Sequence, residues 1–369
     1  MNALGIIFSN IHDSNLSELT QSRTMGSVPF GGRYRLIDFP LSSMVNSGIS
    51  KVGIVTKSNY QSLMDHLGSG MDWDLARKNG GLIILPPFGA EDSSKLYSTR
   101  LEALKGITKF LLRSNEEYVI MSDCDFICNI YYPPILNFHK SMNADVTMVY
   151  QHKKTESGQS NNTFIKFNNE NRVTDIASID NYEGEGNMFL NIYIIKRLFL
   201  LSLINNAVAH GYTNFNLDCL LRNINKYNIF AYDYRGYFSR ITSLPSYYVN
   251  SLKLLTPAVK NELFDYRVVF TKVRDSAPTK YGSLAIVNNS FVADGCDIKG
   301  EVENSILFRG VKVGRGSVIK NSILMQDTYV CENVNLNAVI TDKNVVIRDK
   351  RNLSGCEVQP YFIAKGQMI

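Results

Sequence analysis

A repeat in the C-terminal part of the chain constrains the fold more than any other feature of the sequence. Four segments align on Asn-Ser or Asn-Ala, and their starts lie 15, 17 and 16 residues apart. These starts are Asn289, Asn304, Asn321 and Asn337. Aliphatic residues recur six positions apart inside the segments, as Val292 with Ile298, Val313 with Ile319, and Val330 with Leu336. This periodicity predicts a β-solenoid.

The repeat has a physical basis in how a solenoid buries its apolar side chains. Each of four coils supplies three short strands of about six residues, and each strand points one aliphatic side chain inward. That side chain is buried only when another coil stacks on top. An antiparallel β-sandwich with short strands rich in Val and Ile is the alternative, since periodicity alone does not separate the two. The shared Asn-Ser register favours the solenoid.

The N-terminal part of the chain has a different pattern. Short apolar runs such as "KVGIVT" and "EYVIMSD" alternate with helix-length amphipathic segments up to about residue 250. This alternation predicts βαβ units and a mostly parallel sheet. With 369 residues and 44% hydrophobic side chains, the chain is long enough for two domains. We therefore expect an α/β domain over 1–250, a connector with two prolines over 251–284, and the solenoid over 285–369.

Charge and composition exclude several classes of protein. The net charge is +5, but 39 basic residues are interleaved with 34 acidic ones, so nucleic acid is not an expected partner. No apolar stretch reaches the roughly 18 residues of a membrane span, so no membrane partner is expected. Six cysteines form no CxxC pair and no basic, apolar leader precedes them, which favours a reducing cytoplasm. The five histidines show no metal-ligand spacing, and we expect them to be structural or solvated.

Several motifs carry a family resemblance. The runs "SVPFGGRYRLIDFPLSSMVNSGISKVGIVT", "EYVIMSD" and "NNSFVADGCDIKGEVENSILFRGVKVGRG" resemble the glucose-1-phosphate adenylyltransferase (ADP-glucose pyrophosphorylase) family along nearly the whole chain. The resemblance implies a Rossmann-like nucleotidyltransferase domain, a left-handed parallel β-helix and a tetramer. It also implies a reaction in which glucose 1-phosphate attacks ATP and releases pyrophosphate. Such a site needs a glycine-rich phosphate loop, basic side chains and carboxylates that hold Mg²⁺.

The phosphate-binding elements depart from the family pattern. The first strand leads into "SNIHDSNLSELT", which contains no glycine, although backbone must approach phosphate closely there. Arg23 is kept, but Met25 stands where the resemblance places a lysine that faces phosphate. Thr99, followed by Arg100, stands where a small pair of residues is expected beside the base. The remaining residues of the pocket in the shared "FGGRYRLIDF" motif are Arg33, Arg35 and Asp38.

The metal and sugar positions depart in the same way. Asp123 ends a predicted strand and matches the metal-binding aspartate of the family. Arg240 stands where the second metal aspartate is expected, and a cation there repels a divalent ion. Phe189 replaces a serine at the sugar, so its ring is expected to fill space meant for substrate. Asp123 is therefore expected to be a remnant without bound metal.

Together these substitutions predict a chain with the nucleotidyltransferase fold but without catalytic activity of its own. The chain resembles the GlgD-type subunit of this family, a non-catalytic or regulatory partner of a catalytic GlgC-type subunit in a heterotetramer. We expect no cofactor in this chain, Mg²⁺ in the catalytic partner, and a sugar phosphate or nucleotide as a possible effector. The alternatives are an active glucose-1-phosphate adenylyltransferase and a nucleotide-sugar glycosyltransferase that uses Asp123 and Asp125. An acyltransferase scaffold is disfavoured because no histidine follows His210.

Overall fold

The computed structural model describes the whole chain except residues 88–96, 156–161 and 180–181. Contacts divide it into two compact units. The first, called the α/β unit, comprises 1–12, 39–124 and 128–236. The second, called the solenoid unit, comprises 13–38, 125–127 and 237–369. Each unit consists of several separate segments of the chain, so this division does not test the expected domain boundaries at residues 250 and 285, which stay predictions.

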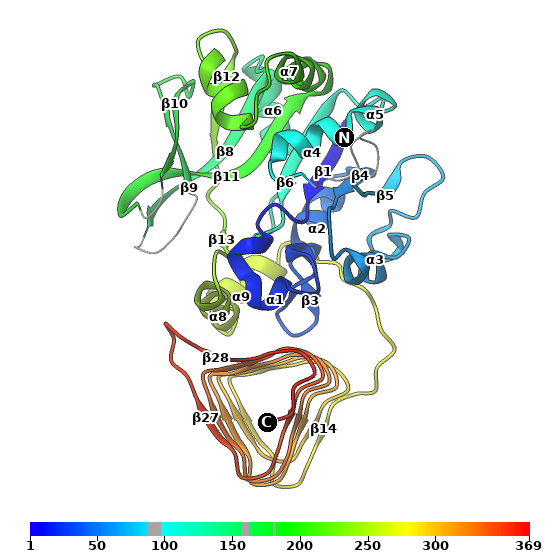
Figure 1. The fold of residues 1–369 in the computed structure, drawn as a ribbon, viewed down its shortest axis with the longest axis vertical. Coiled ribbons are helices and arrows are strands. Elements are labelled where there is room, and N and C mark those ends of the chain that lie inside the picture. The colour runs from blue at the N-terminus through cyan, green and yellow to red at the C-terminus, as the bar shows by residue number, and fades with distance from the viewer. Residues whose placement is uncertain (88–96, 156–161, 180–181) are drawn as a thin grey trace. The chain divides into compact units, whose positions relative to one another are not determined.

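A nine-stranded sheet forms the centre of the α/β unit (Figure 1). Its order is β10-β9-β11-β6-β1-β4-β5, while β8 pairs with β11 and β12 pairs with β8. The strands are β1 (Ala3–Phe8), β4 (Lys51–Val55), β5 (Gly81–Leu85), β6 (Tyr118–Asp123), β8 (Val146–Thr155), β9 (Asn162–Phe167), β10 (Val173–Ile179), β11 (Gly184–Lys196) and β12 (Ile229–Asp233). Strands β6, β1, β4 and β5 are parallel, as expected, but β11 runs antiparallel to β6, β8 and β9. The sheet is therefore mixed.

Asp123 lies at the carboxyl end of β6, a strand in the parallel half of the sheet. All six residues of β1 are buried, as are all six of β6, which is why both strands read as continuous apolar runs. Phe8 and Asp123 are partners in the β1–β6 register and end their strands together. In open α/β sheets the carboxyl ends of parallel strands are where ligand contacts gather.

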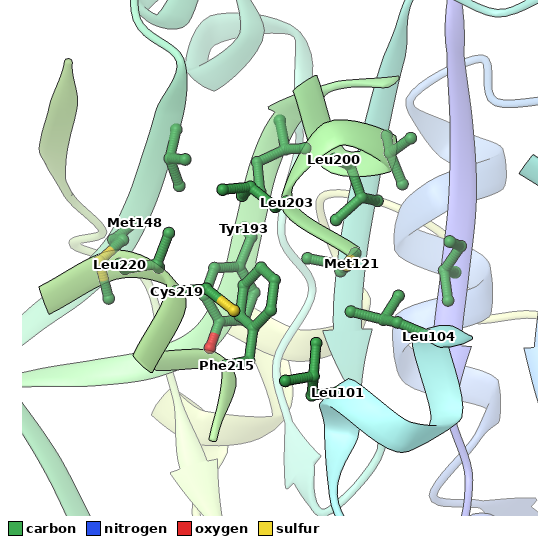
Figure 2. Packing of buried hydrophobic residues seen from close by; sticks show 14 of the residues in the cluster. Leu101, Leu104, Met121, Met148, Tyr193, Leu200, Leu203, Phe215, Cys219 and Leu220 are labelled. Carbon is green, nitrogen blue, oxygen red and sulfur yellow. The ribbon is translucent and has the colours of Figure 1, made fainter. Parts of the chain in front are cut away.

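Helices cover this sheet and enclose its core. They are α2 (Asp38–Asn46), α3 (Gln61–Leu67), η3 (Met71–Trp73), α4 (Arg100–Gly106), α5 (Thr108–Leu112), α6 (Pro133–Ser141), α7 (Arg197–Ala209), the π-helical η4 (Phe215–Leu220) and η5 (Leu221–Asn223). The first residue of α2, Asp38, is assigned to the solenoid unit, and the rest of the helix belongs to the α/β unit. Figure 2 shows Leu101 and Leu104 of α4 near Met121 of β6, with Tyr193 of β11 beside Phe215. This packing fixes the N-terminal end of α4 to the sheet.

Three parallel sheets of five strands make up the solenoid (Figure 1). The first contains β14 (Lys280–Tyr281), β17 (Asp297–Ile298), β20 (Lys312–Val313), β23 (Tyr329–Val330) and β26 (Val346–Ile347). The second contains β15 (Ile286–Asn288), β18 (Glu301–Glu303), β21 (Val318–Lys320), β24 (Asn335–Asn337) and β27 (Asn352–Ser354). The third contains β16 (Phe291–Val292), β19 (Ile306–Leu307), β22 (Ile323–Leu324), β25 (Val339–Thr341) and β28 (Tyr361–Ile363). The predicted left-handed β-helix is confirmed.

The interior of the solenoid explains the aliphatic spacing of the repeat. Inward-facing residues such as Ile298, Val313 and Ile319 are buried in one apolar cluster along the axis. The four sequence repeats supply three strands each, and β14, β15 and β28 lie outside them. The rest of this unit consists of η1 (Asp13–Leu16), α1 (Ser17–Thr20), η2 (Met25–Ser27), β2 (Pro29–Phe30), β3 (Tyr34–Arg35), β7 (Phe126–Ile127), β13 (Ser239–Arg240), α8 (Leu244–Lys253) and α9 (Pro257–Phe264).

One corner of the solenoid accounts for the Asn-Ser signature. Asn289, Asn304 and Asn321 adopt φ values of 40°, 47° and 48°, in the left-handed region that asparagine tolerates. The fourth corner is Ala338 at φ 52°, because Asn337 pairs in register with Lys320. The fourth repeat is therefore shifted by one residue from the alignment on Asn337.

Serine hydroxyls join successive corners. The Ser290 Oγ accepts the backbone N–H of Ser305, the Ser305 Oγ accepts that of Ser322, and the Ser322 Oγ accepts that of Val339. We call this series the serine column. Each hydroxyl also donates to a carbonyl of its own coil, as Ser322 does to Lys320, so both hydrogen-bonding functions are used.

Within the part of the chain that the structure describes, no helix combines the length and the apolar character needed to span a bilayer.

Candidate functional site

The candidate site of the α/β unit is built around Asp123, the last residue of β6. Its carboxylate is fully buried. The Arg100 Nη2 donates to both carboxylate oxygens, at 2.8 Å to Oδ1 and 2.6 Å to Oδ2. The His12 Nε2 lies 2.8 Å from Oδ2. Asp123 is thus in direct contact with two basic side chains.

Arg100 is held in place on several sides. It is the first residue of α4, whose N-cap Thr99 forms a capping box with Glu102. The Arg100 Nη1 donates to the Tyr193 hydroxyl at 3.0 Å. Its guanidinium carbon lies 5.5 Å from the Phe8 ring centroid and 5.2 Å from that of Tyr193, both within cation–π range. Its side chain is only 11% exposed.

These contacts determine the charge state of Asp123. Burial by itself raises the pKa of a carboxyl group, because it penalises the charged form. The Arg100 guanidinium and then His12 outweigh that effect and hold the pKa of Asp123 well below its usual range. Asp123 is therefore a carboxylate whose charge is neutralised by protein groups.

A cavity of about 180 Å³ adjoins Arg100 and His12. Its remaining polar lining consists of neutral hydroxyl and amide side chains, namely Thr99, Thr163, Ser178, Asn191, Asn214 and Asn216. Neutral donors and acceptors with a single permanent cation suit a polyol or sugar phosphate better than a nucleoside triphosphate, which needs several cations. Phe189, expected to fill sugar space, lies fully buried in the core, with its ring centroid 4.7 Å from that of Tyr193.

Arg240 lies in the solenoid unit and pairs with Asp125. Its Nε is 3.4 Å from the Asp125 Oδ2, and both side chains are buried. The short β7–β13 ladder aligns them, and the Asp125 carbonyl also accepts the Ile241 N–H at 2.7 Å. Asp125 is thus neutralised by the arginine that stands where a metal aspartate was expected.

The residues around Asp123 do not fit the Mg²⁺ that the family resemblance implies. Mg²⁺ requires near-octahedral oxygen ligands at about 2.0–2.1 Å and usually keeps several waters. Both oxygens of Asp123 are already in contact with Arg100, and a third contact comes from His12. A divalent ion at this carboxylate would have to displace a guanidinium that is packed between two aromatic rings.

A second candidate site lies within the solenoid unit, and we call it the cationic cluster. It comprises Arg23, Arg35, Arg274 and Lys343, with Asp342 as the acidic member. The Arg23 Nη2 donates to both Asp342 oxygens, at 2.9 and 3.0 Å. The Arg23 Nη1 is buried and has no hydrogen-bond partner among the described residues.

The basic members of the cationic cluster affect one another's charge. Burial, together with the positive charges of Arg35 and Arg23, lowers the pKa of Lys343 to about 7. Burial is the larger cause of this lowered pKa, and the neighbouring guanidinium groups add to it. The cluster therefore has the composition of a binding site for a multivalent anion.

The other predicted pocket residues all lie in the solenoid unit. Met25 is fully buried in η2, and its backbone N–H donates to the Asp13 Oδ1 at 2.8 Å. Arg33 is exposed, with its guanidinium 5.9 Å from the Tyr34 ring centroid. Asp38 begins α2 and accepts the Arg35 N–H at 2.9 Å. Of the predicted set, Arg23 and Arg35 contribute to the cationic cluster.

Sequence reasoning missed His12, Lys343 and the central role of Arg100. One signal for Arg100 was available, since a cation at the first position of a helix is disfavoured by the helix dipole and implies a specific acidic partner. His12 and Lys343 carry no comparable signal, because their neighbours are brought together only by the fold.

Comparisons with known proteins agree with this architecture. Residues 5–177 match the family model for nucleotidyl transferases, and residues 276–357 match the model described as GlmU-like, C-terminal hexapeptide. The glycogen biosynthesis proteins GlgD of Bacillus subtilis and Geobacillus stearothermophilus are each 36% identical to this chain, and both alignments cover 98% of it and 96% of the relative.

A glucose-1-phosphate adenylyltransferase of Clostridium botulinum is 33% identical, over 87% of this chain and 84% of that enzyme. Both structural units and both family models agree with these full-length similarities. The chain belongs to the glucose-1-phosphate adenylyltransferase family, which here includes the GlgD proteins.

Proposed function

We propose that this chain is a non-catalytic, regulatory subunit that supports ADP-glucose synthesis for glycogen by a catalytic subunit of the same family. The observation that carries the proposal is the contact of the Arg100 Nη2 with both carboxylate oxygens of Asp123. A carboxylate neutralised in this way has little attraction left for a metal–triphosphate complex. The chain itself then uses no cofactor, and Mg²⁺ is bound by the catalytic partner.

Magnitudes support the loss of chemistry. Two unit charges about 4 Å apart interact by roughly 4 kcal/mol at an effective dielectric constant near 20, so a fixed guanidinium opposes a cation strongly. Removing one preorganised electrostatic group typically costs about 10²- to 10³-fold in rate. This chain lacks the glycine loop, has Met25 at the expected lysine, and has both Asp123 and Asp125 paired with arginines.

Mixing experiments test the proposal. The purified chain alone should release no pyrophosphate from ATP and glucose 1-phosphate at a rate typical of enzymes, about 1 to 10³ per second. Co-expressed with a catalytic GlgC-type subunit, it should elute as a mixed oligomer, a heterotetramer, and raise the partner's maximal rate or apparent substrate affinity. Separate elution together with unchanged partner kinetics at a molar excess of this chain would refute the regulatory role.

A single reversion should not restore catalysis. Arg240→Asp replaces one cation by the expected carboxylate, but the loop, the lysine and the Arg100–Asp123 pair are unchanged. Groups that act as a unit are strongly non-additive, so one change recovers little. Appreciable Mg²⁺-dependent turnover by the Arg240→Asp chain would favour the alternative of a catalytically active enzyme.

The cationic cluster supports an anionic effector, such as a sugar phosphate or nucleotide. An anion there satisfies the buried Arg23 Nη1 and favours protonated Lys343. Sulfate, which stays doubly charged over the range tested, should therefore raise the melting temperature more at pH 6 than at pH 8. The matched control is Lys320→Met on the solenoid surface, which should keep the response, whereas Lys343→Met should lose it. An equal response in both variants would refute this site.

The glycosyltransferase alternative is less well supported. It requires Asp123 and Asp125 to bind a metal together, but each carboxylate already has its own arginine partner. Hydrolysis or transfer of a nucleotide sugar by the isolated chain would be needed to revive it.

A further inference from the structure

The Asp123 pocket differs from the metal site that its family resemblance implies, and the difference has a specific chemical form. One nitrogen, the Arg100 Nη2, reaches both oxygens of the carboxylate at 2.6 and 2.8 Å. His12 approaches the Oδ2 at 2.8 Å. The carboxylate is thus surrounded at short range by groups that carry or accept protons.

We infer that the Arg100 guanidinium is a built-in substitute for a divalent cation, which neutralises Asp123 permanently and keeps metal ions out of the pocket. This inference deepens the proposed function, but it rests on the geometry of the α/β unit alone. It concerns the isolated chain and requires neither a partner nor turnover.

The surroundings of Arg100 show why the substitute stays in place. The guanidinium lies between Phe8 and Tyr193 within cation–π distance of both, and its Nη1 donates to the Tyr193 hydroxyl. Tyr193 in turn is part of the buried cluster that packs around Met121 and Phe215 (Figure 2). Displacing the guanidinium would break contacts with two strands at once.

The two kinds of cation differ in what they permit. A divalent ion keeps exchangeable coordination positions through which it bridges a carboxylate to phosphate oxygens. Guanidinium carries one delocalised charge, donates hydrogen bonds and has no open coordination position. Arg100 therefore preserves the charge balance of the folded pocket while removing its capacity to recruit a metal–phosphate complex.

Mn²⁺ binding to the purified full chain tests this inference. The free ion can be counted by electron paramagnetic resonance, and no enzyme assay is involved. The unchanged chain should bind no Mn²⁺ at Asp123 at millimolar concentration. Arg100→Met keeps the apolar stem on the aromatic rings but removes the charge, and it should bind Mn²⁺ at least about tenfold more tightly than the unchanged chain.

Two further variants separate charge from packing. Arg100→Lys retains a cation and should still exclude Mn²⁺, whereas Arg100→Met combined with Asp123→Asn should lose the binding gained by Arg100→Met. Arg77→Met, which removes an exposed arginine paired with Asp74, is the matched control and should change nothing.

Either of two results would overturn the inference. One is stoichiometric Mn²⁺ binding by the unchanged chain that disappears in Asp123→Asn. The other is a folded Arg100→Met chain with no gain in Mn²⁺ affinity. If Arg100→Met does not fold, the unchanged chain and Arg100→Lys still decide, because Mn²⁺ binding by either contradicts exclusion by charge. Since turnover is not measured, these results are independent of the regulatory role.

Discussion

The pocket at Asp123 and the cationic cluster at Lys343 both contain buried charged groups, but they differ in the balance of those charges. In the pocket, one carboxylate is in contact with Arg100 and His12, and the arginine uses both carboxylate oxygens. In the cluster, one carboxylate, Asp342, accompanies three arginines and a lysine. The first region pairs its carboxylate with two basic side chains, whereas the second contains more basic than acidic members.

The proposed function interprets the first region as a closed metal site and the second as an anion site. Completed buried charge contributes to a stable fold but leaves little for a substrate to gain. Like charges held close together lower the free energy of unfolding, and a bound anion raises it again. Anion binding at such a place therefore changes the stability of the fold. On the proposed function, the first arrangement accounts for a loss of catalysis and the second for binding of an anionic effector.

The largest expected effect is at Asp123. Asp123→Asn leaves Arg100 without its buried counter-charge, and breaking a buried pair by removing one partner typically costs about 3–5 kcal/mol. Urea denaturation at pH 7 should show a loss of that size in the free energy of unfolding. A loss below about 1 kcal/mol, the range of exposed pairs, would mean that the pocket is not electrostatically complete.

The opposite sign is expected in the cationic cluster. Lys343→Met removes a buried amine whose charge is disfavoured by burial and by neighbouring arginines. In buffer without multivalent anions, the free energy of unfolding at pH 7 should rise by about 1–3 kcal/mol, discounted for partial solvent access. Destabilisation by this substitution would show that Lys343 is already compensated in the folded chain.

The pH dependence of the free energy of unfolding is a further test of the charge on Lys343 in the cationic cluster. The pKa of Lys343 is lowered to about 7 in the folded chain, whereas an unfolded lysine titrates near 10.4. Between these values the unfolded chain holds a proton that the folded chain lacks, so stability rises with pH by up to about 1.4 kcal/mol per unit. Denaturation at pH 7.5, 8.5 and 9.5, chosen inside that window, should show a steeper slope for the unchanged chain than for Lys343→Met.

The smallest effect concerns the helix that carries Arg100. Thr99→Ala removes the N-cap hydroxyl that accepts the Glu102 N–H, at a typical cost of about 1 kcal/mol. Because Arg100 is also held by Phe8, Tyr193 and Asp123, Mn²⁺ should still be excluded. Thr99→Ser, which keeps the hydroxyl, is the control. Mn²⁺ uptake by Thr99→Ala would show that the cap, rather than the guanidinium, closes the pocket.

The sequence predicts the two architectures well because both depend on local periodicity. The Asn-Ser corners at Asn289, Asn304 and Asn321 mark positions that require a left-handed backbone, and the structure has them there. The fourth corner could not be located by residue type, since alanine carries no preference for that conformation. Its position at Ala338 is set by the pairing of β24 with β21.

The sequence does not predict which charged side chains contact one another in the two candidate sites. Two helices, a connecting segment and a strand separate Arg100 from Asp123 in the chain, and the two residues meet because α4 packs on β6. Lys343 meets Arg23 and Arg35 from more than 300 positions away in the chain. Such pairs depend on tertiary contacts that no local pattern encodes. The sequence therefore shows which expected ligand residues are substituted, but not which side chains pair with those that remain.

The serine column of the solenoid limits how this part of the chain can change its length. Every hydroxyl in the column accepts from the next coil and donates to a carbonyl of its own coil, so a one-residue insertion near a corner would misplace all later hydroxyls. Growth or shrinkage of the column must therefore come in whole turns of about 15 to 17 residues. The longer connection 355–360 lies between β27 and β28, beyond the last hydroxyl of the column, where an irregular insertion disturbs no later corner.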